Sequence, residues 1–145
     1  MPEFNYAKGR IVESIAFVTG EMKEFDQDYA NKKYNEYSID AKLQKIIDRT
    51  IENILTAIIE MSGAILAENN IKTDSYSEVM RKIGSFFEFS DTECEILASF
   101  AVQRNRLAHR YLNFRWQVVT FYNKNKEIVK RLLQNIYEYE ASKNK

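Results

Sequence analysis

The segment from Arg104 to Tyr111 holds the side chains of this sequence best suited to chemistry. It reads RNRLAHRY and contains the single histidine of the 145 residues together with three arginines. A neutral imidazole, with an unperturbed pKa of about 6.5, accepts or returns a proton near neutral pH. A guanidinium stays charged and grips phosphate oxygens through a planar fork. The segment therefore combines a proton-transfer group with phosphate ligands.

These groups suffice to cleave RNA without a metal ion. A base takes the proton of the ribose 2'-hydroxyl, the oxygen attacks the adjacent phosphorus, and cations stabilise the negative charge of the transition state. His109 is the candidate for proton transfer and Arg104 for phosphate binding, with Arg106 and Arg110 as further phosphate or RNA ligands. Taken alone, however, a histidine among arginines at a helix end is more typical of a helix cap, because positive charge is favourable there.

Other chemistries lack the residues that they need. One histidine and one cysteine, Cys94, cannot form a His/Cys zinc site within one chain. The sequence contains no HExxH, CxxC or GxSxG motif and no Gly-rich phosphate loop. Cys94 lies beside two glutamates in an apolar segment, which indicates a packing role rather than a reactive thiol. We predict no metal and no cofactor.

The charges are unevenly placed, although 21 basic residues balance 21 acidic ones. No aspartate or glutamate occurs between Glu95 and Glu127. A long acid-free interval indicates an anionic partner bound locally. Equally open is that its cations pair with acids of other helices after folding. The interval holds Arg104, Arg106, His109, Arg110, Arg115, Lys124 and Lys126.

The elements that must position this segment are predicted to be helical. Four glycines and one proline are too few for the turns that would connect many strands, and apolar residues recur at helical spacing. We expect one all-α domain over residues 1–145, a compact antiparallel bundle of about five helices. Four of the predicted helices cover about residues 6–29, 40–69, 91–109 and 115–139. The fifth, which comes third in the chain, is short and begins at a capping box of Ser75 and Glu78. A second box, Ser90 and Glu93, precedes the helix at 91–109. The length of the second helix suggests a homodimer through a helical face.

Helix geometry limits how the segment can work. At about 100° per residue, Arg104 and His109 lie roughly 140° apart on a straight helix, whereas Arg104 and Tyr111 lie within about 20°. We therefore expect either a helix that ends near His109, leaving Tyr111 and Leu112 in a loop, or a site completed by a second subunit. Asn105, four residues before His109, is spaced to orient the imidazole.

The aromatic residues near the segment admit two roles. Phe114, Trp116, Phe121 and Tyr122 are candidates for stacking on unpaired bases, but their helical spacing is more typical of core residues.

The N-terminal stretch MPEFNYAKGR is unlike a signal peptide, and the apolar run ILTAII is far shorter than the roughly 20 residues that span a bilayer. A single cysteine excludes an internal disulfide, so we expect a cytoplasmic protein with no membrane partner.

The Arg-x4-His-x-Tyr spacing, with Asn105 directly after the first arginine, resembles the signature of HepT-like proteins of the HEPN superfamily. The likeness extends to the long apolar second helix and the short capped third. It implies a metal-independent ribonuclease that acts as a homodimer, with the two motifs facing each other. It also implies the toxin of a toxin–antitoxin pair whose partner is a minimal nucleotidyltransferase.

Carried onto this sequence, the resemblance makes Arg104 the ligand of the scissile phosphate, His109 the proton-transfer residue and Asn105 a supporting residue. Tyr111 matches the tyrosine that such antitoxins modify with AMP, although it is equally well explained as a packed aromatic with a wet hydroxyl. The competing hypothesis is a non-catalytic helical dimer that binds a nucleotide or docks a nucleotidyltransferase. A buried His109 would favour this second hypothesis.

Overall fold

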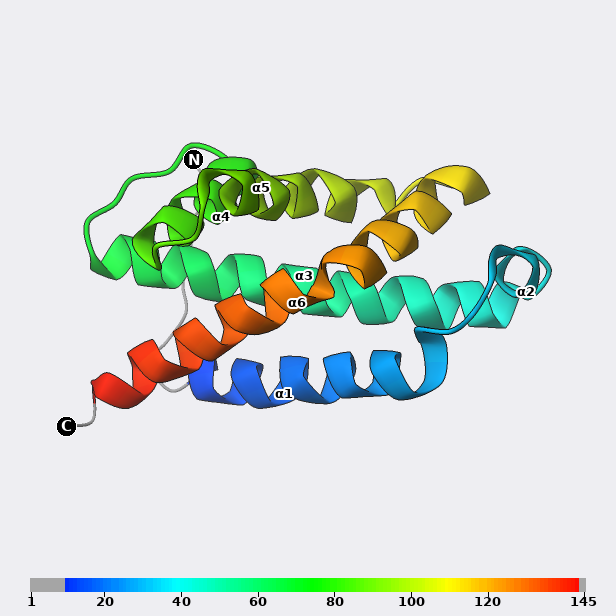
Figure 1. Cartoon of the computed structure of the whole chain (residues 1–145), viewed down its shortest axis with the longest axis horizontal. Coiled ribbons are helices and arrows are strands. Elements are labelled where there is room, and N and C mark those ends of the chain that lie inside the picture. Colours follow the sequence, from blue (N-terminus) through cyan, green and yellow to red (C-terminus); the bar gives the residue numbers. More distant parts are fainter. Residues whose placement is uncertain (1–9, 144–145) are drawn as a thin grey trace.

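The computed structural model describes residues 10–143, and every regular element in this part of the chain is helical. The all-α prediction is therefore confirmed. Helix α3 runs along the length of the molecule with α1 on one side and α4 and α5 on the other, and α6 crosses obliquely (Figure 1). The elements are α1 (Arg10–Glu24), the π-helical turn η1 (Phe25–Tyr29), α2 (Tyr34–Ser38), α3 (Ala41–Glu68), α4 (Tyr76–Phe86), α5 (Asp91–Arg106) and α6 (Leu112–Ser142).

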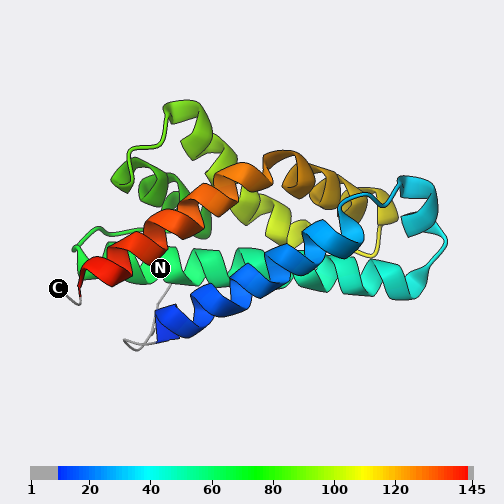
Figure 2. The same cartoon turned by 60° about the horizontal axis from the view of Figure 1, so that its bottom comes forward.

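Residues 10–143 form six α-helices where five were predicted, because the polar stretch after η1 folds into α2. The polar composition of this stretch did not predict a helix, but the side chain of Tyr37 is fully buried and anchors it. Helix α2 lies at the end of α3 remote from the C-terminus (Figure 2). The predicted second helix matches α3 to within a residue at each end. The start predicted for the first helix falls at residues 6–9, outside the described residues.

The starts of the three helices that follow α2 are fixed by side-chain caps. The Asp40 carboxylate accepts from the Leu43 amide (3.1 Å) at the start of α3. Before α5, Ser90 and Glu93 form the complete predicted box, with bonds of 3.1 and 3.0 Å. Before α4, Ser75 accepts from the Glu78 amide (3.1 Å), as predicted, but the Glu78 carboxylate accepts from the Asp74 amide (3.2 Å). The expected Ser75–Glu78 box is therefore only half formed.

Helix α3 is the central core helix. Within residues 10–143 it is the one helix long and apolar enough to cross a membrane by length and composition alone. In the most apolar 18-residue stretch of α3, 72% is buried inside the structure. Isoleucines 47, 51, 54, 58 and 65 of α3 are all inaccessible to solvent. Burial of this kind is what the wide apolar face of a core helix requires.

A buried polar network joins α2 and α3 to the first turn of α6. The Tyr37 hydroxyl donates to one Asp48 carboxylate oxygen (2.6 Å), and Arg115 donates to the other (2.8 Å). Arg115 also donates to the Gln44 side-chain oxygen (3.3 Å). Burial, together with the hydrogen bond and charge of Asp48, raises the pKa of the Tyr37 phenol far above its usual value. The network fixes the position of α6 immediately after the RNRLAHRY segment.

Two cations of the acid-free interval form ion pairs with acids of other helices, which is one of the two alternatives that the sequence left open. Arg115 pairs with Asp48 of α3 across the core. Lys126 pairs with Asp26 of η1 (2.9 Å). Among the ion pairs of residues 10–143, none involves Arg106 or Arg110, whereas Arg104 borders Glu52 and Glu60 of α3.

Helices α4 and α5 pack tightly at Gly84, where a β-carbon would lie 2.7 Å from the Cys94 sulfur and 3.2 Å from Leu97. We expect Gly84→Ala to lower the free energy of unfolding by about 1–3 kcal/mol, since the added methyl group overpacks this contact. Gly20→Ala is the matched control, because nothing lies within 4 Å of its β-carbon position and a helical glycine favours replacement by alanine by about 0.5–1 kcal/mol. Urea denaturation measures both, and equal effects would contradict the close approach.

Candidate functional site

The RNRLAHRY segment lies at the junction between α5 and α6. Helix α5 ends at Arg106, and a tight turn follows in which the His109 amide donates to the Arg106 carbonyl (3.1 Å). Tyr111 is the extended residue that precedes α6. The predicted break near His109 is confirmed, although α5 ends three residues earlier than expected. The expectation that Leu112 belongs to the loop is wrong, because Leu112 begins α6, three residues before the anchored Arg115.

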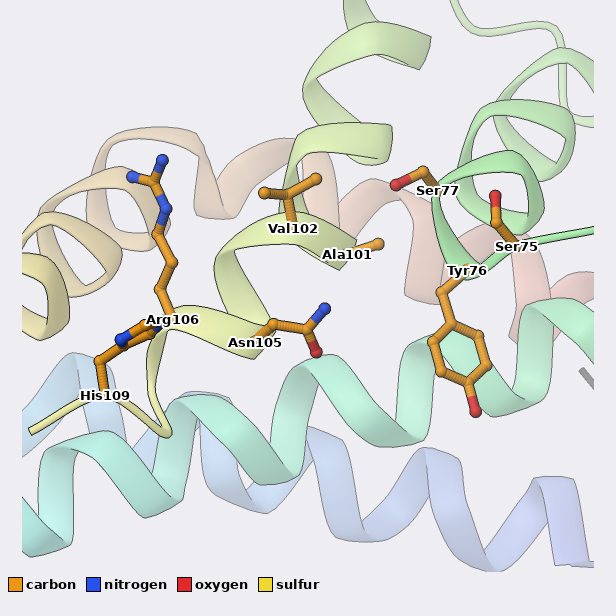
Figure 3. A pocket seen from close by; sticks show the side chains of 8 residues that line it. All are labelled: Ser75, Tyr76, Ser77, Ala101, Val102, Asn105, Arg106 and His109. Carbon is orange, nitrogen blue, oxygen red and sulfur yellow. The ribbon is translucent and has the colours of Figure 1, made fainter.

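His109, Asn105 and Arg106 line one open groove of about 600 Å³ between the start of α4 and the end of α5. Figure 3 shows the Asn105 side chain between His109 on one side and Tyr76 on the other. His109 and Asn105 are exposed, and Arg106 is half-buried. The remaining residues that line the groove are Ser75, Tyr76, Ser77, Ala101 and Val102.

The groove suits an anionic ligand. None of the described residues that line it is acidic, and its two basic side chains are Arg106 and His109. The Arg106 guanidinium donates to the Gln117 side chain of α6 (3.3 Å), a neutral partner that leaves the positive charge in place. Amide and hydroxyl groups of Asn105, Ser75 and Ser77 supply further hydrogen-bonding capacity. Among residues 10–143, no group of three or more His, Cys, Asp or Glu side chains is placed to hold a metal ion.

Arg104 does not line this groove. Its Nε donates to the Thr56 hydroxyl of α3 (2.7 Å), and its guanidinium carbon lies 6.0 Å from the centre of the Tyr76 ring. Tyr76 borders both the groove and the small cavity beside Arg104. The described chain therefore does not bring Arg104 and His109 into one groove.

Arg110 and Tyr111 lie beyond His109, on the exposed side of the junction. The Arg110 guanidinium carbon is 5.6 Å from the centre of the Tyr111 ring, and Tyr111 is 56% exposed. Phe114 makes edge contacts with the rings of His109 (5.6 Å) and Tyr111 (5.7 Å). The core expectation is wrong for Phe114, which is 41% exposed. It holds for Trp116, Phe121 and Tyr122, which pack in or against the core.

The groove also contains residues that sequence reasoning missed. Val102 and Tyr76 line it, and they are 49% and 43% exposed. A spacing signal for Val102 was available, because positions 102, 105, 106 and 109 follow the i, i+3, i+4, i+7 pattern of one helix face. Tyr76 had no such signal, since only the packing of α4 on α5 brings it there. Among the hydrogen bonds of residues 10–143, none joins Asn105 to His109, so the predicted orienting bond is not formed.

Comparison with known proteins defines the family. The family model described as Ribonuclease HepT-like matches residues 18–139, from the middle of α1 to near the end of α6. The chain belongs to the HepT-like ribonuclease family. Membership implies ribonuclease activity, and the matched range contains the whole RNRLAHRY segment of this HepT-like chain. No curated protein matches the sequence. His109 is exposed, so the buried histidine that would have favoured the non-catalytic alternative is not observed.

Proposed function

We propose that this HepT-like protein is a metal-independent endoribonuclease that cleaves RNA by attack of a 2'-hydroxyl on the adjacent phosphate. The observation that carries the proposal is the exposed His109 in a groove without acidic side chains, beside Arg106 and Asn105. Phosphate oxygens are favoured in such a groove, and the imidazole is accessible for proton transfer.

Each residue has a defined role in this proposal. His109 removes the 2'-hydroxyl proton or returns a proton to the leaving oxygen, and Arg104 stabilises the charge on the scissile phosphate. Asn105 supports the site by hydrogen bonding, and Arg106 and Arg110 bind neighbouring phosphates. Because Arg104 lies outside the groove of its own chain, we propose a homodimer in which the two RNRLAHRY segments face each other. The exposed apolar side chain of Val102 in the groove is available to the interface.

The product of cleavage tests this mechanism. Purified protein incubated with single-stranded RNA and EDTA is expected to cleave at an undiminished rate and to leave 2',3'-cyclic phosphate ends. Mass spectrometry of the fragments identifies these ends. Loss of activity in EDTA with recovery on adding Mg²⁺, or fragments with 5'-phosphate ends, would contradict the proposal, because 2'-hydroxyl attack expels a 5'-hydroxyl group.

We propose further that the protein is a cytoplasmic toxin and that a minimal nucleotidyltransferase silences it by transferring AMP from ATP to the Tyr111 hydroxyl, with release of pyrophosphate. The exposed phenol is accessible, and a nucleotide there would add bulk and negative charge next to His109. Co-expression with such a nucleotidyltransferase is expected to add one AMP to the wild-type mass and none to Tyr111→Phe. An adduct on a different side chain, or full cleavage activity of the modified protein, would contradict this role.

We also propose that residues 1–145 form one domain, since the described helices share one core.

A further inference from the structure

The exposed ring of Phe114 requires an explanation of its own. Most large apolar side chains of the first half of α6 pack inward, whereas Phe114 projects from the first turn into solvent. It does not project alone, because its ring contacts His109 at 86° and Tyr111 at 81°. Both contacts are edge contacts, and neither is a parallel stack.

The backbone helps to keep these rings in place. Tyr111 precedes α6 with extended torsion angles (φ −75°, ψ 118°), so its side chain leaves the junction beside the first helical turn. On the far side of that turn, Asn113 accepts from the Tyr34 hydroxyl of α2 (3.1 Å), and Arg115 is anchored to Asp48. The first turn of α6 is thus fixed to α2 and α3, and Phe114 is presented from a rigid element. We name the rings of Tyr111 and Phe114 the aromatic platform.

The charges around the aromatic platform indicate what it binds. The Arg110 guanidinium lies over the Tyr111 ring, and His109 lies against Phe114. No acid occurs within the interval from residue 96 to 126 that carries these residues. Exposed aromatic rings combined with nearby cations and no carboxylate in the same segment suit a ligand that is both flat and anionic. Nucleotides of an unpaired RNA strand have this combination, with bases that stack on aromatic rings and phosphates that bind arginine.

We infer that the aromatic platform binds an unpaired nucleobase of the RNA next to His109, so that the protein selects single-stranded RNA. The inference deepens the proposed ribonuclease function and depends on it. A base stacked on Phe114 or Tyr111 would hold its own phosphate near Arg110 and the neighbouring phosphate near His109. Bases inside a duplex are paired and stacked on one another, and cannot reach the rings. A second copy of this chain is the rival occupant, because it would also cover an exposed phenylalanine.

Binding of a labelled oligonucleotide tests the inference. The probe is a fluorescent single strand of 2'-O-methyl RNA, which cannot be cleaved by 2'-hydroxyl attack, and its affinity is measured by fluorescence anisotropy. Phe114→Leu keeps an apolar side chain but removes the aromatic face. We expect it to weaken binding about 5- to 100-fold, as loss of one base stack does. Phe114→Trp is expected to restore wild-type affinity.

Two controls isolate stacking from other effects. Tyr137→Leu removes another exposed aromatic side chain from the same helix, far from His109, and should leave the affinity unchanged. A duplex of the same sequence should bind wild type and Phe114→Leu equally. Circular dichroism melting shows whether each variant folds, and light scattering gives its oligomeric state.

The outcomes are distinct. Wild-type affinity of Phe114→Leu would overturn the aromatic platform while leaving the ribonuclease proposal intact. A change of oligomeric state in Phe114→Leu would assign the ring to an interface between two copies and would also overturn it. If wild type neither binds nor cleaves RNA, the proposed function itself fails. Weaker single-strand binding by a folded Phe114→Leu of unchanged oligomeric state, with rescue by Phe114→Trp, supports the inference.

Discussion

Replacing His109 by alanine is expected to lower the rate of RNA cleavage by about 100- to 10,000-fold, the range for loss of a general acid or base. His109 is the single histidine of the chain and is exposed in the groove, so no other imidazole can substitute. Stability should change little, because an exposed side chain is truncated. Single-turnover cleavage of a labelled RNA measures the rate, and anisotropy with the non-cleavable strand checks that RNA still binds.

The matched control is Lys124→Ala, which removes an exposed positive charge from the same acid-free interval but away from the groove. Its cleavage rate is expected to stay near that of wild type. Full activity of His109→Ala would contradict the assignment of proton transfer to His109. Equal loss in both variants would indicate that general attraction of RNA to positive charge, rather than proton transfer, limits the reaction.

Replacing Asp48 by alanine is expected to lower the free energy of unfolding by about 3–5 kcal/mol. The carboxylate accepts from the Tyr37 hydroxyl and from Arg115, and its removal leaves a partly buried guanidinium without its counter-charge. That cost is a large part of the stability of an ordinary domain, so partial unfolding at 37 °C would follow. Urea denaturation followed by circular dichroism measures the change.

Two further variants separate the network from general effects on α3. Glu52→Ala removes an exposed acid from the same helix and should change stability by no more than about 0.5 kcal/mol. Replacing the whole network with apolar side chains (Tyr37→Phe, Asp48→Leu and Arg115→Met) should recover much of the loss, because no buried polar group is then left unpaired. If Asp48→Ala were as mild as Glu52→Ala, the buried network would not anchor α6.

The parts of the fold that the sequence predicts well are governed by local physics. The 28-residue span of α3 follows from a continuous apolar pattern and the Asp40 cap. The Ser90 box follows from short-range hydrogen bonding. The end of α5 is less predictable from the sequence. The apolar pattern continues to Leu107, which is buried, but the helix itself ends one residue earlier, at Arg106. Helix ends of this kind depend on the turn that follows and not on the pattern before it.

The arrangement of the candidate site depends on contacts that no local pattern encodes. Arg104 and His109 are close in sequence, yet packing turns Arg104 toward Thr56 of α3, whereas His109 lines the groove and contacts Phe114 of α6. Phe114 has the spacing of a core residue but is exposed on the first turn of α6, although Leu112 of the same turn packs against the core. Tyr76 enters the groove only because α4 packs on α5. The sequence therefore predicts which residues carry the chemistry better than it predicts which of them share a groove.

The most direct test of the central proposal is cleavage of a single-stranded DNA oligonucleotide that contains one ribonucleotide, with EDTA present. Attack by a 2'-hydroxyl predicts one cut, directly after that ribonucleotide, with a 2',3'-cyclic phosphate on the upstream fragment. The all-DNA strand of the same sequence should stay intact, and His109→Ala should leave both strands uncut. Cleavage of the all-DNA strand, or cutting at positions without a 2'-hydroxyl, would contradict the mechanism.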